Sequence, residues 1–264
     1  MAGYKTHKIF HLTDSGTAGT ELDLINEEPL SIRVQGKPYT VVMRTPGDEI
    51  AHVAGFCLGE GIVDSPDDIE TLAYCDDDIN VVTATIKPER AAGISDVLMR
   101  RGFISQTSCG ICGKELVEDL KQQVNPVHEG QILSIATASA SLDALGQNQA
   151  LRDKTRASHG AAAYTADGRI LSIGEDAGRH NALDKCIGSL FLEKKLDQAA
   201  FIVLSSRISY ELVQKTARAG IPVILAVSRP TTLAVDLARD LGMTLACLNK
   251  KSGLFIFCGE HRIV

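Results

Sequence analysis

The chain contains no tryptophan, and aromatic residues make up only 5% of its 264 residues. We therefore expect a core that rests on Ala, Val, Ile and Leu. Long Lys/Arg runs are absent and the formal net charge is −6, which argues against nucleic-acid binding, because such proteins usually carry a basic face. No apolar run approaches the roughly 20 residues that span a bilayer, and the N-terminus lacks the apolar stretch of a secretory signal. These absences predict a cytoplasmic protein without membrane contact.

Hydrophobic residues make up 44% of the chain and charged residues 23%, as is ordinary for a globular protein. The length predicts one large domain or two modest ones. The seven cysteines are odd in number, and five stand singly in apolar or mixed surroundings, where thiols act as small hydrophobes in a reducing compartment. These five are Cys57, Cys75, Cys186, Cys247 and Cys258.

The first half of the chain predicts a small α/β region. Residues 1–27 are polar and irregular, and we expect a loosely held arm there. Asn125-Pro126 closes a helical stretch, so we place the domain boundary near residue 128, giving domains 1–128 and 129–264. Apolar alternation and helical spacing predict strands at 30–34, 39–44 and 79–86, and helices at 45–62, 91–102 and 114–123.

The second half predicts a mostly parallel sheet with helices on its faces, because apolar runs alternate with helical patterns. Ligands in such sheets bind at the carboxyl ends of the strands. The polar loops there precede helix N-termini, which favour anions, although ordinary capping explains them too. The expected strands are 169–174, 200–206, 221–228 and 243–248, and the helices are 178–195, 208–220 and 230–242.

Cys109 and Cys112 form a Cys-x-x-Cys pair in the glycine-punctuated segment QTSCGICGKE. Lys114 and a predicted helix start nearby would lower the pKa of a thiol there toward neutrality. A thiolate at Cys109 could accept a sulfane sulfur from a donor persulfide. Cys112 could then hold the loop, resolve the persulfide, or take no part.

Other interpretations of the pair stay open on its chemistry alone. The two residues could be ordinary loop thiols, or a thioredoxin-like redox pair, although that motif usually follows an early strand. Structural zinc needs about four ligands, and the sequence has neither a second Cys-x-x-Cys nor a His-x₃₋₅-His motif. A zinc deaminase needs His-x-Glu and Pro-Cys-x-x-Cys, which the sequence lacks. On the chemistry of the pair alone, thiol-based group transfer is favoured only slightly over a redox function.

Several segments between Leu30 and Phe257 together resemble the FdhD/NarQ family of formate dehydrogenase accessory sulfur carriers. They are TPGDEIAHVAGFCLGEGIV, SCGICGKE, EDAGRHNALDKCIG and the long stretch that begins SSRISYELVQKTARAG. EDAGRHNALDKCIG is the most specific of them.

The resemblance implies that Cys109 carries a persulfide sulfur. The sulfur would come from a cysteine desulfurase and go to a molybdenum or tungsten bis-molybdopterin guanine dinucleotide cofactor, which then enters formate dehydrogenase. It also implies a homodimer without a tightly bound metal of its own. The implied fold is α/β, with a C-terminal three-layer α/β/α cytidine-deaminase-like domain and a smaller N-terminal α/β region. The sequence does not decide whether such a sulfurtransferase-like carrier counts as an enzyme. Two alternative functions stay open: a chaperone that binds the cofactor without transferring sulfur, and a dithiol oxidoreductase.

The expected cofactor site draws on the family's C-terminal segment Gly-Phe-x-Arg-x-x-x-x-Asn-x-Tyr, from which this chain departs. Lys250 replaces Arg and loses the bidentate fork, while Phe255 and Phe257 remove polar contacts. Arg156 and Ala157 replace two glycines before His159. The expected cofactor-binding residues are Leu248, Asn249, Lys250, Lys251, Ser252, Gly253, His159, Arg179, His180, Ser206 and Arg207.

Overall fold

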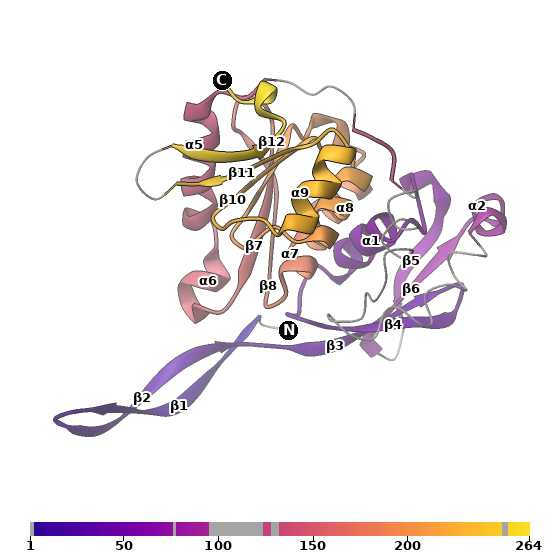
Figure 1. Ribbon diagram of the computed structural model, residues 1–264. Helices are drawn as coiled ribbons and strands as arrows, with labels where there is room; N and C mark the ends of the chain where they lie inside the picture. The colour runs from indigo at the N-terminus through magenta and orange to yellow at the C-terminus, as the bar shows by residue number, and fades with distance from the viewer. Residues whose placement is uncertain (1–2, 76–77, 95–123, 128–131, 250–252) are drawn as a thin grey trace.

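The structure is a computed structural model, shown in Figure 1. It describes residues 3–75, 78–94, 124–127, 132–249 and 253–264. These residues form a mixed α/β protein with two larger sheets and one projecting hairpin. No helix among them is long and apolar enough to cross a bilayer.

An antiparallel hairpin of β1 (Tyr4–Thr13) and β2 (Gly16–Ile25) forms the N-terminus. It projects from the body of the protein (Figure 1). At the start of β1, the Tyr4 hydroxyl accepts a 2.5 Å hydrogen bond from the amino group of Lys154, which attaches the hairpin to the rest of the protein. The prediction of an irregular arm is therefore wrong. Most side chains on both of its faces are exposed, so the usual alternation of buried and exposed residues is missing.

A four-stranded sheet of order β4-β3-β6-β5 follows. Leu30 and Ile32 alternate with partly exposed neighbours along β3 and point into the core. Helix α1 begins after Asp48, within the predicted helix 45–62. The elements are β3 (Glu28–Val34), β4 (Lys37–Arg44), α1 (Glu49–Gly59), β5 (Ile69–Cys75), β6 (Asp78–Ile86) and α2 (Pro88–Gly93). The predicted helix 114–123, and 91–102 from residue 95 on, lie outside the described residues.

The second sheet has six strands in the order β12-β11-β10-β9-β7-β8. Its three central apolar strands β9, β10 and β11 are parallel. The pairs β7–β8, β7–β9 and β11–β12 are antiparallel, so the expected parallel arrangement holds for the three central strands and is wrong for the outer pairs. The strands are β7 (His159–Tyr164), β8 (Ile170–Asp176), β9 (Phe201–Leu204), β10 (Val223–Ala226), β11 (Thr244–Leu248) and β12 (Leu254–Cys258).

Helices cover both faces of this sheet (Figure 1). On one face, α5 packs on β7, β9 and β10 around a small apolar cluster. On the other, α1, α7, α8 and α9 surround a larger cluster that also takes in the four-stranded sheet. One core therefore joins the two halves of the chain. The helices are α5 (Ile135–Gln147), α6 (Ala150–Thr155), α7 (Arg179–Leu192), α8 (Tyr210–Arg218) and α9 (Thr232–Asp240); 3-10 turns lie at Pro66–Asp68, Leu196–Gln198 and Glu260–Arg262.

Helices α1 and α7 touch backbone to backbone, through glycines. A Cβ added at Gly188 would lie 1.8 Å from the Ala51 carbonyl oxygen, and one at Gly55 would lie 2.0 Å from the Asp184 carbonyl oxygen. Real Cβ atoms essentially never come within 3.0 Å of another heavy atom. The approach requires glycine at both positions, and it seats the first half of the chain on the second.

Candidate functional site at one edge of the six-stranded sheet

One edge of the six-stranded sheet collects the carboxyl ends of β8, β9, β10 and β11 and the starts of β7 and β12. Strands β9, β10 and β11 run parallel, so their carboxyl ends share this edge. Strand β7 runs against β9 and begins there, while β8 runs against β7 and ends there. The topology thus brings together the loops that follow β8, β9, β10 and β11 with the start of β7, as expected for a ligand site in an α/β sheet.

Three of the expected cofactor-binding residues lie close together at this edge. His159 is the first residue of β7, and Arg179 and His180 open α7 directly after β8. Burial lowers the pKa of the His159 imidazole, and the neighbouring charge of Arg179 lowers it further. His159 is therefore a neutral imidazole at pH 7.

Two buried nitrogens of this group have no hydrogen-bond partner within the described chain. They are Nδ1 of His159 and Nε of Arg179. A buried polar nitrogen without a partner costs free energy unless something binds it. A phosphate oxygen would satisfy both kinds of group. The residues here therefore fit an anionic ligand such as a nucleotide pyrophosphate.

His180 has partners within the fold. Its Nε2 lies 3.2 Å from the Ser209 hydroxyl and 3.7 Å from a carboxylate oxygen of Glu211. The His180 side chain is the main cause that lowers the pKa of Glu211 to about 2. His180 thus ties the start of α7 to the start of α8, in addition to any contact it makes with a ligand.

The loop after β9 supplies an exposed cation to the edge. The Gly160 amide donates a 2.8 Å hydrogen bond to the Ser205 hydroxyl, which fixes this loop beside the start of β7. The buried Ser206 hydroxyl donates to the Arg207 carbonyl oxygen at 3.0 Å. Ser206 therefore shapes the loop, whereas the exposed Arg207 side chain can contact a ligand.

The remaining described residues of the expected site lie at the far end of the same edge. Leu248 closes β11 and Asn249 follows it, and the Asn249 amide donates a 3.0 Å hydrogen bond to the Gly253 carbonyl oxygen. Lys250, Lys251 and Ser252 lie outside the described residues.

Comparisons with known proteins place the chain in a family. The FdhD/NarQ family profile matches residues 25–264. The chain belongs to the FdhD/NarQ family. A relative named sulfur carrier protein FdhD from Streptomyces avermitilis is 36% identical over 273 residues, covering 97% of this chain and 94% of the relative. The protein of the same name from Mycobacterium tuberculosis is 37% identical and covers 99% of both chains.

A solved structure shares the fold. It is a crystal structure from Desulfotalea psychrophila, which its name describes as that of a putative formate dehydrogenase accessory protein. The two chains superpose with a TM-score of 0.80 at 22% identity, covering 100% of each. The mixed α/β arrangement described above is therefore also that of this crystal structure.

Two segments that carried the family resemblance meet in a buried joint. The Asp176 carboxylate accepts a 2.9 Å hydrogen bond from the Thr45 amide. Its Oδ2 also lies 2.9 Å from the amino group of Lys185, which donates to the Thr45 carbonyl oxygen at 2.7 Å. All three residues are at most 3% exposed. This joint fixes the end of β4 against the end of β8 and the middle of α7, a structural role that the motifs alone did not reveal.

The expected sulfur-carrying residues, Cys109 and Cys112, lie outside the described residues. The five described cysteines are free thiols, and four of them are buried. Burial raises the pKa of the Cys57 and Cys186 thiols to about 12, and it also raises the pKa of Cys247 and Cys258. These four thiols stay protonated at pH 7 and are poor nucleophiles, as expected for cysteines that serve as small hydrophobes.

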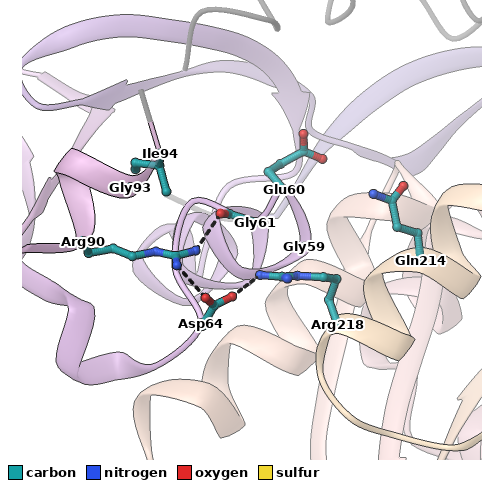
Figure 2. Close-up of a pocket in the computed structure, with 9 residues that line it drawn as sticks. All are labelled: Gly59, Glu60, Gly61, Asp64, Arg90, Gly93, Ile94, Gln214 and Arg218. Atoms are coloured by element: carbon teal, nitrogen blue, oxygen red, sulfur yellow. Dashed lines mark hydrogen bonds and ion pairs between the residues drawn. The ribbon is translucent and has the colours of Figure 1, made fainter. Parts of the chain in front are cut away.

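A cavity of about 200 Å³ lies where α1, α2 and α8 meet (Figure 2). Asp64 sits between two arginines, 2.6 Å from Arg90 and 2.5 Å from Arg218. Arg90 also donates to the carbonyl oxygens of Gly61 and Ile62. Because protein groups already occupy these guanidinium donors, the cavity is a structural joint rather than an anion site. No group of three or more His, Cys, Asp or Glu side chains suited to a metal occurs in the described part of the chain.

The polar loops expected after the strands contain Glu175 and Arg229, but the sequence did not indicate what these two residues contact. Glu175 accepts hydrogen bonds from the Leu151 amide at 2.8 Å and from the Ser158 hydroxyl at 2.8 Å, which anchors α6 beside β7. Arg229 and Phe255 line a second cavity at the ends of β10 and β11. Arg229 stands in the polar loop Ser228-Arg229-Pro230, which the sequence predicted at the carboxyl end of a strand, whereas Phe255 was expected only to remove a polar contact.

Proposed function

We propose that this chain is a sulfur carrier that takes a persulfide sulfur on Cys109 from a cysteine desulfurase. It passes the sulfur to a molybdenum or tungsten bis-molybdopterin guanine dinucleotide, the client cofactor of formate dehydrogenase. The observation that carries the proposal is the Ser-Cys-Gly-Ile-Cys-Gly-Lys segment in a chain whose relatives are named sulfur carrier protein FdhD.

The loading step needs no external oxidant or reductant. The Cys109 thiolate attacks the terminal sulfur of the donor's persulfide, and the S–S bond of the donor breaks. The donor cysteine leaves as a thiolate, while Cys109 becomes the persulfide. Lys114 is adjacent to the pair in sequence and favours the thiolate that starts this exchange. The raised pKa of the buried thiols Cys57 and Cys186 supports assigning the sulfur to the Cys-x-x-Cys segment.

The edge of the six-stranded sheet supports a site for the client nucleotide. Arg179, His159 and Arg207 gather there, with two buried nitrogens that no described residue satisfies, and guanidinium groups suit pyrophosphate oxygens geometrically. Each pyrophosphate would lie along this edge, and Leu248 and Asn249 would contact the far end of the ligand. Lys250, Lys251, Ser252 and Gly253 belong to the same proposed contact segment.

The proposal extends to the organisation of the protein. We place the Cys-x-x-Cys region in an N-terminal domain of residues 1–128 and the nucleotide edge in a C-terminal domain of residues 129–264. The helices on both faces of the six-stranded sheet (Figure 1) are compatible with a cytidine-deaminase-like domain that lacks zinc chemistry. We further propose that the protein works in the cytoplasm as a homodimer, which light scattering coupled to size-exclusion chromatography would test.

Complementation separates sulfur transfer from two other functions. A bacterial strain that lacks its own family member would express the wild-type chain, Cys109→Ser or Cys112→Ser, and formate dehydrogenase activity would be measured. The proposal predicts that Cys109→Ser abolishes maturation of the dehydrogenase. Full maturation by Cys109→Ser would favour a chaperone that binds the cofactor without carrying sulfur. Loss of activity in Cys112→Ser alone would favour a dithiol oxidoreductase.

A further inference from the structure

The cavity at the ends of β10 and β11 has the size of a small-ligand pocket. Its volume is about 570 Å³, within the roughly 300–1,000 Å³ that such pockets occupy. The lining residues come from the loop after β10, from the end of β11 and from the start of β12; they are Val227, Ser228, Arg229, Cys247, Leu248, Asn249 and Phe255.

Phe255 gives this cavity an accessible aromatic ring. In the antiparallel pair of β11 and β12, Phe255 lies directly opposite Cys247, so both side chains point to the same face of the sheet. Cys247 is 1% exposed and forms a closed floor, whereas Phe255 remains 43% exposed. An aromatic ring held on a strand and open to solvent is a surface on which another flat ring can stack.

Arg229 lies over this ring, with its guanidinium carbon 5.6 Å from the ring centroid. The Arg229 side chain is exposed, and it makes no ion pair with any residue that the structure describes. It can therefore swing outward at small cost to admit a planar ligand. A guanidinium and a phenyl ring together hold a nucleobase by stacking on both of its faces.

The positive charge in the cavity favours a ligand whose ring is attached to an anionic group such as a phosphate. Arg229 is a cation, and no carboxylate is among the described residues that line the cavity. Strand β10 lies beside β9 in the sheet, and neighbouring strands are about 4.8 Å apart. A ligand whose base occupies the cavity can therefore extend its phosphates along the same edge, toward Arg207 after β9.

We propose that Phe255 and Arg229 form a stacking subsite for the base of a nucleotide. Such a subsite would let the chain bind a nucleotide although Phe255 stands where the family pattern has Asn. Stacking on Phe255 takes the place of the hydrogen bond that an Asn side chain could make at this position. The choice of guanine as the base rests on the proposed function, whereas the stacking geometry rests on the cavity.

Isothermal titration calorimetry with guanosine diphosphate and with inorganic pyrophosphate tests the subsite. We expect Phe255→Leu to weaken binding of guanosine diphosphate roughly 5- to 150-fold, the range for losing one stacked base. Phe255→Tyr should retain the affinity, and pyrophosphate affinity should be the same in all three proteins. Far-ultraviolet circular dichroism would check that each variant is folded.

Fluorescence gives an independent readout, because the chain has no tryptophan. Phe255→Trp introduces a single reporter in the cavity, and Phe10→Trp places a control on the hairpin, where Phe10 is 82% exposed. Guanosine diphosphate should quench the first reporter in a saturable way and leave the second unchanged, while pyrophosphate should quench neither.

The results separate the subsite from the proposed function. If Phe255→Leu binds guanosine diphosphate as tightly as the wild type, the stacking subsite is wrong, but nucleotide binding by the edge stands. Equal weakening of diphosphate and pyrophosphate binding would also overturn the stacking assignment. If the wild-type chain binds no guanosine diphosphate at all, both the subsite and the proposed nucleotide site are wrong.

Discussion

Replacing Gly188 by alanine should destabilise the protein strongly through a single methyl group. The added Cβ would lie 1.8 Å from the Ala51 carbonyl oxygen and 2.6 Å from the Gly55 amide nitrogen. Both neighbours are backbone atoms of α1, so no side-chain rotation relieves the clash. The two helices must separate by more than an ångström to restore the 3.0 Å that real Cβ contacts respect.

We expect Gly188→Ala to lower the free energy of unfolding by about 3 kcal/mol, the upper end of the usual cost of overpacking. For a chain of this size that corresponds to a fall in Tm of roughly 6–12 °C. Urea unfolding followed by far-ultraviolet circular dichroism measures the change, because the chain has no tryptophan to report on it.

Gly146 in α5 offers a matched control of opposite sign. A Cβ added there meets nothing within 4 Å, and alanine is favoured over glycine in a helix by about 0.5–1 kcal/mol. Gly146→Ala should therefore raise stability by up to that amount. If Gly188→Ala proved as stable as the wild type, or if both variants lost stability equally, the inferred backbone contact of α1 with α7 would be wrong.

Three further predictions follow from buried and exposed charges. Burial holds the pKa of His52 well below its ordinary value, so the unfolded chain binds the proton that the folded chain excludes, and stability falls as the pH drops below 6.5. His52 should contribute a loss of about 2 kcal/mol between pH 6.5 and 5 in urea unfolding, so His52→Asn should reduce the pH dependence of stability by about that amount, whereas His11→Asn should leave the dependence intact. The amino group of Lys215 lies 2.8 Å from both carboxylate oxygens of the buried Asp184; Lys215→Met should cost about 3–5 kcal/mol by leaving that carboxylate unpaired, and an unchanged unfolding midpoint would contradict this. Arg207→Gln should weaken pyrophosphate binding in calorimetry about tenfold or more by removing a charge-assisted contact, while the exposed Arg239→Gln serves as a control that should not.

The sequence pattern predicted the central sheet because its strands are buried on both faces. Residues 201–204 and 223–226 are continuously apolar, and each lies in the core. The same reasoning predicted that the polar loops after these strands lie at one edge of the sheet, and the loops after β9, β10 and β11 do so; that they bind a ligand stays a prediction. His159 reaches that edge for another reason, because β7 runs against β9 and begins there.

Other features left no signal that a single sequence could show. The hairpin of β1 and β2 buries neither face, so the alternation that marks a strand is missing. Glycines inside a helical pattern count against a helix, and only the packing shows that Gly55 and Gly188 permit the contact of α1 with α7. The antiparallel outer strands depend on which strands pair, which periodicity does not encode.

Mass spectrometry after sulfur loading tests the central claim most directly. The purified chain would be incubated with a cysteine desulfurase and cysteine, digested without reductant, and analysed for a peptide that gains the mass of one sulfur atom. We predict that this gain falls on the peptide containing Cys109, persists in Cys57→Ala, and disappears in Cys109→Ala. Loading of one sulfur that survives Cys109→Ala would contradict the assignment.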